Sequence, residues 1–308
     1  MRTYRFMFPV LLAMTATGSL TAKSSDKGDS GIQFPEVSQV KIEDAFWKPK
    51  LDLWQKVTVN DVFDKFEGKH LEHPGKFCNT FENFDRVAKG ERNIGQHAGA
   101  PWFDGLVYET IRGVADLMAR QSDVALEKRV DGYIDRIAKA QASEPNGYID
   151  TYTQLMEADH QWGERGGMLR WQHDVYNAGM LVEAGIHYYN ATGKTKLLEV
   201  ATRCANLMAG YMGAFPKKNV VPAHSGPEEA LVKLYIIYKN NPELKKQINV
   251  PVAEQDYLKL AEFWIEGRGH HCGFPLWGTW GNPVLPTIPG KQILLPCLFL
   301  LPNHEPIL

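Results

Sequence analysis

The sequence predicts an all-α protein built from repeated helical hairpins. Apolar residues recur at the period of an α-helix over most of the chain, and the alternation that is typical of strands is scarce. The hairpins also resemble one another, because a helix that ends in tyrosine is followed by a polar turn and by a helix with a Leu-x-x-Ala step. Two such sets are Tyr189 with Leu198 and Ala201, and Tyr238 with Leu258 and Ala261. Since each pair of helices must bury its apolar face on the next pair, repeated hairpins indicate an α-toroid or a solenoid.

The composition is that of an ordinary globular protein without a nucleic-acid partner. Of the 308 residues, 44% are hydrophobic and 23% are charged, and the net charge is −2, so no basic excess indicates a nucleic-acid surface. Aromatic residues make up 11% of the chain. This richness fits carbohydrate recognition, because sugar rings stack on aromatic faces, and it equally fits an aromatic core, which is the commoner explanation.

The N-terminus has the features of a secretory signal peptide in residues 1–22. A positively charged start precedes an apolar run at residues 6–16, and small residues follow it. The run is too short to span a membrane, so we expect no membrane span in the mature chain. Residues 23–36 are expected to form a flexible tether. The mature protein is therefore predicted to be periplasmic or extracellular.

Helices are predicted in succession along residues 37–282, which we expect to form one helical domain. They cover about 50–66, 101–121, 123–141, 170–193, 194–213, 226–239 and 254–269. Gly193 is expected to close the helix that precedes it, because glycine adopts the left-handed conformation of a helix end at little cost. Residues 146–155, NGYIDTYTQL, are expected to form a short β-hairpin arm after the Asn-Gly turn.

Residues 283–308 break this pattern. They contain six of the chain's 18 prolines and almost no charge, and their apolar residues have no usable period. We expect an irregular tail without regular elements here, of the kind that a frame-shifted reading frame would produce.

The stretch 221–235, VPAHSGPEEALVKLY, places His224 directly before a predicted helix start. Ser225 and Glu228 have the spacing of a capping box, and Pro227 is tolerated in a first turn. The positive end of the helix dipole disfavours protonation of His224, and a neutral imidazole held there suits a hydrogen bond to a hydroxyl. A histidine in a surface loop is the alternative interpretation.

Residues 156–179 form the densest polar and aromatic segment of the chain. They include Asp159, His160, Trp162, Glu164, Arg165, Trp171, His173 and Asp174. Stacking rings beside polar groups fit a sugar pocket, while a solvated loop whose acids cap the next helix is the alternative. Two tryptophans and two histidines are costly on an exposed loop, which favours the pocket. Asp104 opens another helix, and it becomes functional if that helix end faces the same cleft.

No metal site is expected in this chain. His270, His271 and Cys272 are adjacent, and adjacent residues in a loop point apart and rarely chelate one ion. The four cysteines show no CxxC spacing, and the sequence has no HExxH, GxGxxG or GxSxG motif. Sequence spacing selects no carboxylate pair for glycoside hydrolysis either, because separation in space is what matters.

Several segments follow one another as they do in one known enzyme family. They include WFDGLVYETIRGVADLMA, NGYIDTYTQL, WQHDVYNAGMLVEAGIHYYNATG and PAHSGPEEALVKLY. Over residues 37–282 the chain resembles glycoside hydrolase family 127, the β-L-arabinofuranosidases and their relatives. The resemblance implies an (α/α)6 toroid followed by β-sandwich domains, and exo-hydrolysis of β-L-arabinofuranosyl-type units of plant cell-wall glycans. It also implies a retaining mechanism with a zinc-bound cysteine thiolate as nucleophile and a glutamate as acid/base.

The resemblance assigns His173 and His224 to sugar-contacting positions. Met180 stands where the family commonly carries a second histidine. The family's zinc-ligand glutamate and cysteines lie beyond the last residue of this chain, and Cys272 and Cys297 do not match them. We therefore expect an incomplete (α/α)6 toroid that is truncated before its nucleophile. No cofactor is expected in this chain, and zinc is expected in a full-length parent.

The sequence thus predicts an exported glycoside hydrolase, or a truncated part of one, with a carbohydrate partner. The predicted sugar-binding residues are Asp104, His160, Trp162, His173 and His224. The catalytic residues and the oligomeric state are left open. The alternatives are a catalytically inactive glycan-binding helical module and an enzyme similar to the unsaturated-uronyl hydrolases, which would use an acid within the present segment.

Overall fold

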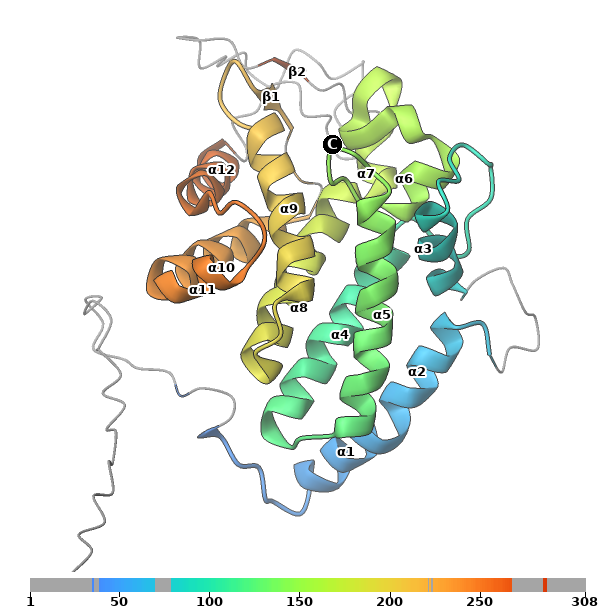
Figure 1. The fold of residues 1–308 in the computed structure, drawn as a ribbon, viewed down its shortest axis with the longest axis vertical. Coiled ribbons are helices and arrows are strands. Elements are labelled where there is room, and N and C mark those ends of the chain that lie inside the picture. Colours follow the sequence, from blue (N-terminus) through green and yellow to red (C-terminus); the bar gives the residue numbers. More distant parts are fainter. Residues whose placement is uncertain are drawn as a thin grey trace, which may run out of the picture. The chain divides into compact units, whose positions relative to one another are not determined.

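The computed structural model describes residues 35, 39–69, 79–220, 222, 224–267 and 285–286, and helices run through most of these ranges (Figure 1). The chain divides into the units Met1–Phe34 and Pro35–Leu308, and all described residues belong to the second unit. The predicted signal peptide and most of the predicted tether therefore lie outside the described residues. The adjacent residues His270, His271 and Cys272 lie outside them as well.

The elements follow one another along the chain as mostly long helices joined by short connections. The α-helices are α1 Trp47–Leu53, α2 Val59–Phe66, α3 Thr80–Ala88, α4 Phe103–Arg120, α5 Val124–Ala142, α6 Thr151–Met156, α7 Leu169–Gln172, α8 Asp174–Thr192, α9 Lys196–Tyr211, α10 Pro227–Asn240, α11 Pro242–Gln247 and α12 Glu254–Gly267. A π-helical turn, Trp54–Thr58, joins α1 to α2, and a 3-10 segment, Ala158–Gly166, precedes α7. The strands β1 Lys218–Asn219 and β2 Leu285–Pro286 pair antiparallel.

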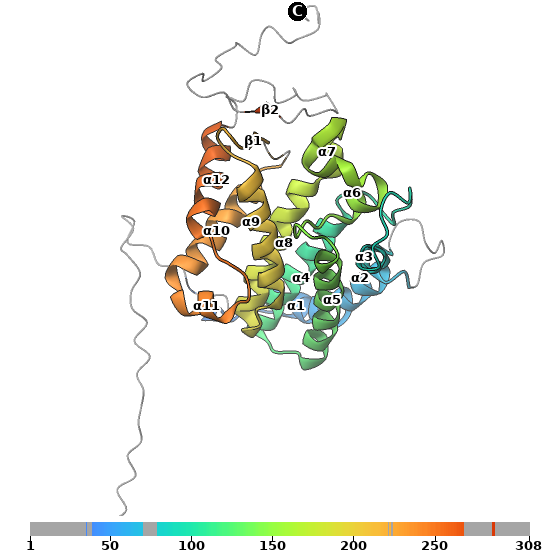
Figure 2. The ribbon, with the colours of Figure 1, turned by 45° about the horizontal axis from the view of Figure 1, so that its top comes forward.

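The long helices of the unit lie in two layers, which Figures 1 and 2 show from two directions. In the first layer α4 packs against α8, and α8 packs against α10. In the second layer α9 packs against α5 on one side and against α12 on the other. The layers are joined where α8 meets α9 and α10 meets α12. The starts of α4, α8 and α10 carry the predicted site residues Asp104, His173 and His224.

The predicted all-α architecture of helical hairpins is confirmed, and local signals explain where several helices start and stop. Asp123 and Asp150 each accept a hydrogen bond from a backbone N–H of the first turn of α5 and α6. Gly193 closes α8 with φ of 73°, as predicted. Helix α8 is buried on almost every side, because α4, α9 and α10 surround it.

The prediction of a β-hairpin arm at residues 146–155 is wrong. Asn146 and Gly147 do form a turn, in which the Asn146 side chain accepts a hydrogen bond from the Tyr148 N–H. Residues after it form helix α6 instead of a strand. The Asp150 carboxylate accepts from the Thr153 N–H at 2.8 Å, so a helix-capping signal outweighs the apolar alternation of this segment.

The predicted capping box at the start of α10 is also wrong. The N-cap residue is Gly226, one position later than the predicted Ser225, and no side chain caps this helix end. Pro227 occupies the first helical position, where its fixed φ suits a helix start. His224 therefore lies two residues before the N-cap.

The prediction that residues 283–308 form no regular element is wrong at one point. Leu285 and Pro286 pair with β1, with Lys218 opposite Pro286 and Asn219 opposite Leu285. All other residues of this tail lie outside the described ranges.

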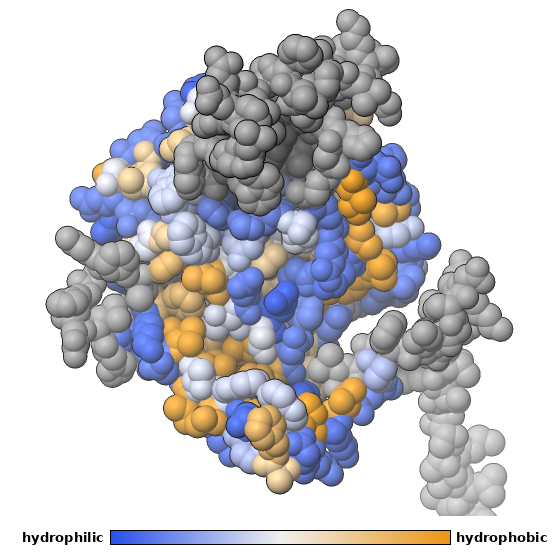
Figure 3. Space-filling model, turned by 180° about the vertical axis from the view of Figure 1, so that it is seen from behind, coloured by the Kyte–Doolittle hydropathy of each residue, from blue (hydrophilic) through white to orange (hydrophobic). Residues whose placement is uncertain are grey.

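Apolar side chains stay exposed on parts of the surface. On the first helices Trp47, Leu53, Trp54 and Val57 are exposed, and Ile236 is exposed on α10. Figure 3 shows hydrophobic patches, with hydrophilic surface between them, on the face opposite the one seen in Figure 1. Patches of this kind are typical of surfaces that contact further protein. Within the described ranges, none of the helices combines the length and the apolar character that crossing a bilayer requires.

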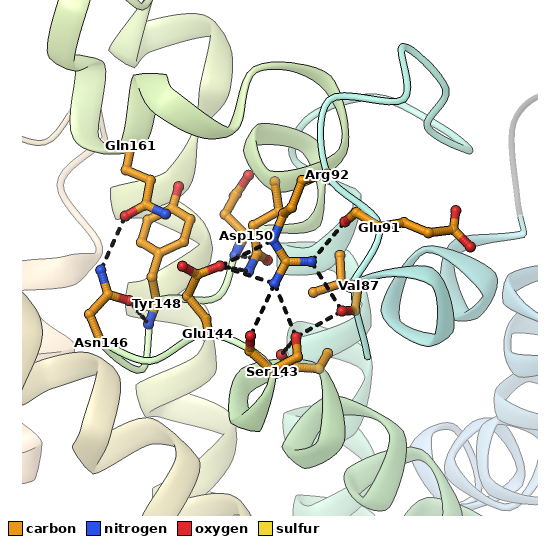
Figure 4. Close-up of polar contacts among 11 residues, drawn as sticks. Val87, Glu91, Arg92, Ser143, Glu144, Asn146, Tyr148, Asp150 and Gln161 are labelled. Atoms are coloured by element: carbon orange, nitrogen blue, oxygen red, sulfur yellow. Dashed lines mark hydrogen bonds and ion pairs between the residues drawn. The ribbon is translucent and has the colours of Figure 1, made fainter. Parts of the chain in front are cut away.

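Arg92 ties the end of α3 to the end of α5, as Figure 4 shows. Its Nε and Nη2 donate to one carboxylate oxygen of Glu144 at 3.2 and 3.0 Å, and Nη2 also donates to the Ser143 hydroxyl at 3.0 Å. Its Nη1 donates to the carbonyl oxygens of Val87 and Glu91. The guanidinium therefore fixes the start of the loop that runs from α3 to α4.

We predict that Arg92→Ala lowers the free energy of unfolding by about 2–3 kcal/mol, because it removes the charged donor of the half-buried Glu144 carboxylate and the donor of the Glu91 carbonyl oxygen. Urea denaturation measures this loss. Lys246→Ala is the control, since Lys246 is 72% exposed and its ion pair with Glu243 should contribute about 0–0.5 kcal/mol. Equal losses in the two variants would contradict the role given to Arg92.

Candidate active site

The starts of α4, α8 and α10 bring five aromatic and imidazole rings together. The Trp102 ring precedes α4 and lies 5.1 Å from the His173 ring, centroid to centroid. The His173 ring lies 5.2 Å from the His224 ring, and Tyr176 lies 5.0 Å from His224. Trp171 completes the group, with its ring edge-on to Trp102 at 6.1 Å. We call these five residues the ring cluster.

Two glycines allow the helix starts to approach closely enough for these contacts. A Cβ atom on Gly105 of α4 would lie 2.6 Å from Cε1 of Tyr176. A Cβ atom on Gly179 of α8 would lie 2.9 Å from Cα of Pro227, the first residue of α10. Real Cβ atoms do not approach other atoms this closely, so any larger residue would push the helices apart. The glycines therefore set the spacing on which the ring cluster depends.

His173 is held in a defined orientation at the N-terminus of α8. It is the N-cap residue and has φ of 59°, a left-handed conformation that is uncommon outside glycine. Its Nδ1 lies 2.7 Å from the carbonyl oxygen of Trp171. A carbonyl oxygen only accepts hydrogen bonds, so Nδ1 carries the hydrogen, and Nε2 is the acceptor nitrogen of the neutral ring.

A carboxylate is hydrogen-bonded to the hydroxyl of one ring of the cluster. The Tyr176 hydroxyl donates to Oε1 of Glu109 at 3.2 Å. Burial, followed by the nearby Glu109 charge, raises the pKa of Tyr176 to about 12, so the phenol keeps its proton. The Trp171 indole N–H donates to the Tyr152 hydroxyl at 2.8 Å, which holds the Trp171 ring in place.

Three carboxyl groups are buried where α4, α6 and α8 begin. They belong to Asp104, Asp150 and Asp174, each at most 1% exposed. Burial is the main cause that raises the pKa of Asp104 to about 8 and the pKa of Asp150 to about 6. Burial also raises the pKa of Asp174. Asn177 joins this region together, because its side chain donates to Asp150 and to the Pro101 carbonyl oxygen, and it accepts from the Gly105 N–H.

Asp104 and Trp162 are both buried in the structure. Asp104 is 1% exposed, and both of its oxygens bond to Thr151. Trp162 is 3% exposed, and its ring packs edge-on against Tyr148 at 4.8 Å. Both residues lie in the packed interior, because tertiary contacts cover the helix end and the loop in which they occur.

The His160 ring pairs with an acid of its own segment, and its carbonyl oxygen accepts from the side chain of Gln172, between Trp171 and His173. Its Nδ1 is 3.1 Å from a carboxylate oxygen of Glu157, three residues earlier. The remaining predicted residues, His173 and His224, are the two that the structure brings together. Whether each of the five predicted residues contacts a sugar stays a prediction.

The polar segment around Trp162 lines a separate cavity of about 440 Å³. Glu164 and Arg165 contribute to its wall from the 3-10 segment, and Tyr211 contributes from the end of α9. The Tyr211 hydroxyl donates to the Glu164 carboxylate. Neither His173 nor His224 lines this cavity, so the described part of the chain offers two distinct polar and aromatic regions.

The residues that the structure describes do not fit the zinc-thiolate centre implied by the resemblance. Among them, no group of three or more histidine, cysteine or acidic side chains could hold a metal ion. The described cysteine, Cys204, is buried in α9, and burial raises the pKa of its thiol to about 12. A thiolate nucleophile therefore does not form at Cys204 near neutral pH.

The sequence of the chain matches the profile of one enzyme family over most of its length. Residues 39–291 match the β-L-arabinofuranosidase GH127 catalytic domain. The chain belongs to the GH127 family. The GH127 chain is 28% identical over 189 residues to the non-reducing end β-L-arabinofuranosidase of Bifidobacterium longum subsp. longum, which covers 61% of this chain and 26% of that protein.

Two solved structures of GH127 enzymes have the same fold as this chain. One is a β-arabinofuranosidase with 29% identity and a TM-score of 0.63, aligned over 76% of this chain and 34% of the other. The second is a β-L-arabinofuranosidase from Geobacillus stearothermophilus T6 with 27% identity and a TM-score of 0.62, aligned over 79% and 36%. The likeness confirms the predicted fold, an incomplete (α/α)6 toroid of helical hairpins. The GH127 chain spans about a quarter of the curated relative and about a third of the solved chains.

Proposed function

We propose that the ring cluster binds a terminal β-L-arabinofuranosyl-type unit, and that the chain is a glycoside hydrolase or the sugar-binding part of one. The observation that carries this proposal is the approach of the His173 and His224 rings to 5.2 Å, from two separate helical hairpins. The family supports the substrate class. A furanosyl ring carries several hydroxyls and an apolar face, so it needs both polar and aromatic contacts.

The ring cluster supplies both kinds of contact. The faces of Trp102 and Tyr176 offer stacking surface for the apolar side of a sugar. Nε2 of a neutral His173 accepts a hydrogen bond from a sugar hydroxyl, since Nδ1 donates to the Trp171 carbonyl oxygen. The His173 ring contacts both the Trp102 ring and the His224 ring. A sugar held there would be gripped from the ends of α4, α8 and α10 together.

The proposal includes retaining hydrolysis in a full-length parent, in which zinc would serve as cofactor. The described residues do not fit that metal centre, so in this proposal they bind and orient the sugar. Export to the periplasm or the outside of the cell is proposed from the signal-peptide features of residues 1–22. Export would bring the protein to plant cell-wall glycans, whose terminal arabinofuranosyl units are the proposed substrate.

We predict that His173→Ala weakens the binding of a β-L-arabinofuranosyl disaccharide by about 10–100-fold, because it removes one hydrogen bond and part of the ring contact. Isothermal titration calorimetry of the chain measures this change. Glu164→Gln is the matched control, because Glu164 lines the separate cavity, and its affinity should stay within about twofold of the wild type.

A loss of affinity with Glu164→Gln and none with His173→Ala would contradict the proposal. That result would indicate that the sugar binds in the cavity that Glu164 lines. Binding without release of arabinose would favour the inactive glycan-binding module. Turnover that is abolished by His173→Ala and insensitive to thiol reagents would favour the hydrolase type that uses an acid of the present segment.

A further inference from the structure

A buried chain of hydrogen-bonded groups links the loop before α4 to the starts of α4 and α6. His97 Nδ1 lies 3.1 Å from the Gly99 carbonyl oxygen, and His97 Nε2 lies 3.0 Å from the Thr151 hydroxyl. The same hydroxyl lies 2.7 Å from Oδ1 of Asp104. The Thr151 N–H donates to Oδ2 of Asp104, also at 2.7 Å. We call the groups from Gly99 through His97 and Thr151 to Asp104 the proton chain.

The proton chain needs one hydrogen more than a neutral histidine and an ionised carboxylate can supply. The Gly99 carbonyl oxygen only accepts, so His97 Nδ1 carries a hydrogen. The Thr151 hydroxyl has one hydrogen, which fills either its contact with His97 Nε2 or its contact with Asp104. The remaining contact then takes its hydrogen from a doubly protonated His97 ring or from a protonated Asp104.

Burial decides which of the two partners carries the additional proton. Burial lowers the pKa of His97 to about 4. Burial, followed by the Asp150 charge, raises the pKa of Asp104 to about 8. A neutral ring and a neutral carboxylic acid also avoid placing two charges in the interior. Near pH 7 the Asp104 hydroxyl therefore donates to Thr151, and the Thr151 hydroxyl donates to His97.

The surroundings of Asp104 favour the same assignment. His97 of the preceding loop reaches Asp104 through Thr151, and the Asp150 carboxyl before α6 and the Tyr108 hydroxyl of α4 interact with it directly. Tyr148, Asp174 of α8 and Cys204 of α9 are the titratable groups around Asp150. On α3, which also packs against this region, Arg86 is paired with Glu82 at 3.0 Å. A nearby negative charge disfavours ionisation of a carboxyl group, so the charge of Asp150 helps to keep Asp104 neutral.

We propose that Asp104 is a positioning residue that carries a buried proton at neutral pH, and that this proton keeps the loop carrying His97 in the place that sets Trp102 against His173. Trp102 comes three residues after Gly99, and its ring lies 5.1 Å from the His173 ring. The His97 ring also lies edge-on to Tyr152 at 5.4 Å, and Tyr152 accepts the hydrogen bond of Trp171. The proton chain thus supports the ring cluster on two sides.

Replacement of Asp by Asn at positions 104 and 150 distinguishes a protonated carboxyl group from an ionised one. In Asp104→Asn the amide N–H donates to the Thr151 hydroxyl, and the amide oxygen still accepts the Thr151 N–H, so every bond of the proton chain is kept. Asp150 is the matched control, because its two oxygens accept from the Thr153 N–H and the Asn177 amide. An asparagine at position 150 would point its amide N–H at either the Thr153 N–H or the Asn177 amide N–H, and one of these hydrogen bonds would be lost.

We expect the unfolding equilibrium constant of Asp104→Asn to stay within about fivefold of the wild type at pH 6.5, while Asp150→Asn raises it about 10–100-fold. Urea denaturation of the unliganded chain gives both constants. A rise for Asp104→Asn as large as that for Asp150→Asn would overturn the proposal, since it would show that Asp104 acts as an ionised acceptor.

The pH dependence of stability gives a second, independent readout. Between pH 6.5 and 8 the folded wild type keeps the Asp104 proton, while the unfolded chain, with its ordinary carboxyl pKa, has lost it. The wild type therefore loses stability as pH rises through this window, and its unfolding constant relative to Asp104→Asn rises by up to about tenfold per pH unit. His97 titrates in both proteins, and Asp150 contributes to the difference between the two curves through its interaction with Asp104. Parallel curves for the two proteins would overturn the proposal.

The carboxyl ¹³C chemical shift of Asp104 in the labelled wild type tests the same point without a substitution. We expect the shift of a carboxylic acid at pH 6.5 and a titration near pH 8. The shift of an ionised carboxylate at pH 6.5 would overturn the proposal even where the variants fail to fold. These measurements read the unliganded fold, so their outcome is separate from that of the sugar-binding test.

Discussion

Asn177→Ala lowers the free energy of unfolding by about 4 kcal/mol in our account, the largest stability loss that we predict. The Asn177 side chain is fully buried in the first turn of α8 and bonds to three residues at the starts of α4 and α6. It donates to Asp150 at 2.7 Å and to the Pro101 carbonyl oxygen at 2.9 Å, and it accepts from the Gly105 N–H at 3.0 Å. In the alanine variant, each of these three buried groups loses its hydrogen bond to Asn177. Each buried polar group that loses its hydrogen bond lowers the free energy of unfolding by about 1–3 kcal/mol.

Urea denaturation measures the effect of Asn177→Ala, with Asn190→Ala as the control. Asn190 lies near the other end of the same helix and is exposed, so its replacement should change stability by at most about 0.5 kcal/mol. A loss of less than about 1 kcal/mol at position 177 would show that water satisfies these groups in the variant. In that case Asn177 would not be the link that joins the starts of α4, α6 and α8.

Gly105→Ala is expected to cost about 2–4 kcal/mol, the second largest effect. The added Cβ would lie 2.6 Å from Cε1 of Tyr176 and 2.7 Å from Oδ1 of Asn177. Relief of this overlap requires α4 and α8 to separate or both side chains to move, which also displaces Tyr176 from the ring cluster. We therefore expect a lower melting temperature together with weaker sugar binding.

Gly113→Ala is the control for this variant. Gly113 lies on the same helix, and a Cβ atom there would meet nothing within 4 Å. Alanine favours a helix over glycine, so this variant should gain roughly 0.5–1 kcal/mol. Thermal unfolding and calorimetric titration of the two variants in parallel measure both effects. Similar stability of the Gly105 and Gly113 variants would contradict the close packing of α4 on α8.

The main helices could be predicted from sequence because each one has a strong local signal. Apolar periodicity and helix ends such as Gly193 are properties of neighbouring residues, and they specify a helix before any tertiary contact forms. The segment 146–155 shows where this reasoning failed, since both a turn signal and a helix cap were present. The cap of Asp150 prevailed because the carboxylate is buried and bonded to Asn177, a contact 27 residues away that local patterns do not contain.

Only part of the candidate site could be predicted from the sequence. His224 was predicted from its place before a helix start and His173 from the polar and aromatic segment 156–179, but no local pattern indicates that Trp102 lies against His173. A tryptophan directly before a helix whose first turn holds a buried acid and a glycine, as in PWFDG, is the signal that could have suggested it. The burial of Asp104 and Trp162 could not be predicted either, because it results from packing between elements that are distant in sequence.

The most direct test of the account is a crystal structure of the chain with a bound β-L-arabinofuranoside. Our account predicts sugar hydroxyls within about 3.2 Å of a ring nitrogen of both His173 and His224, with the sugar ring resting on Trp102 or Tyr176. A sugar bound instead in the cavity lined by Glu164 and Tyr211, or in contact with one of the two histidines alone, would contradict it.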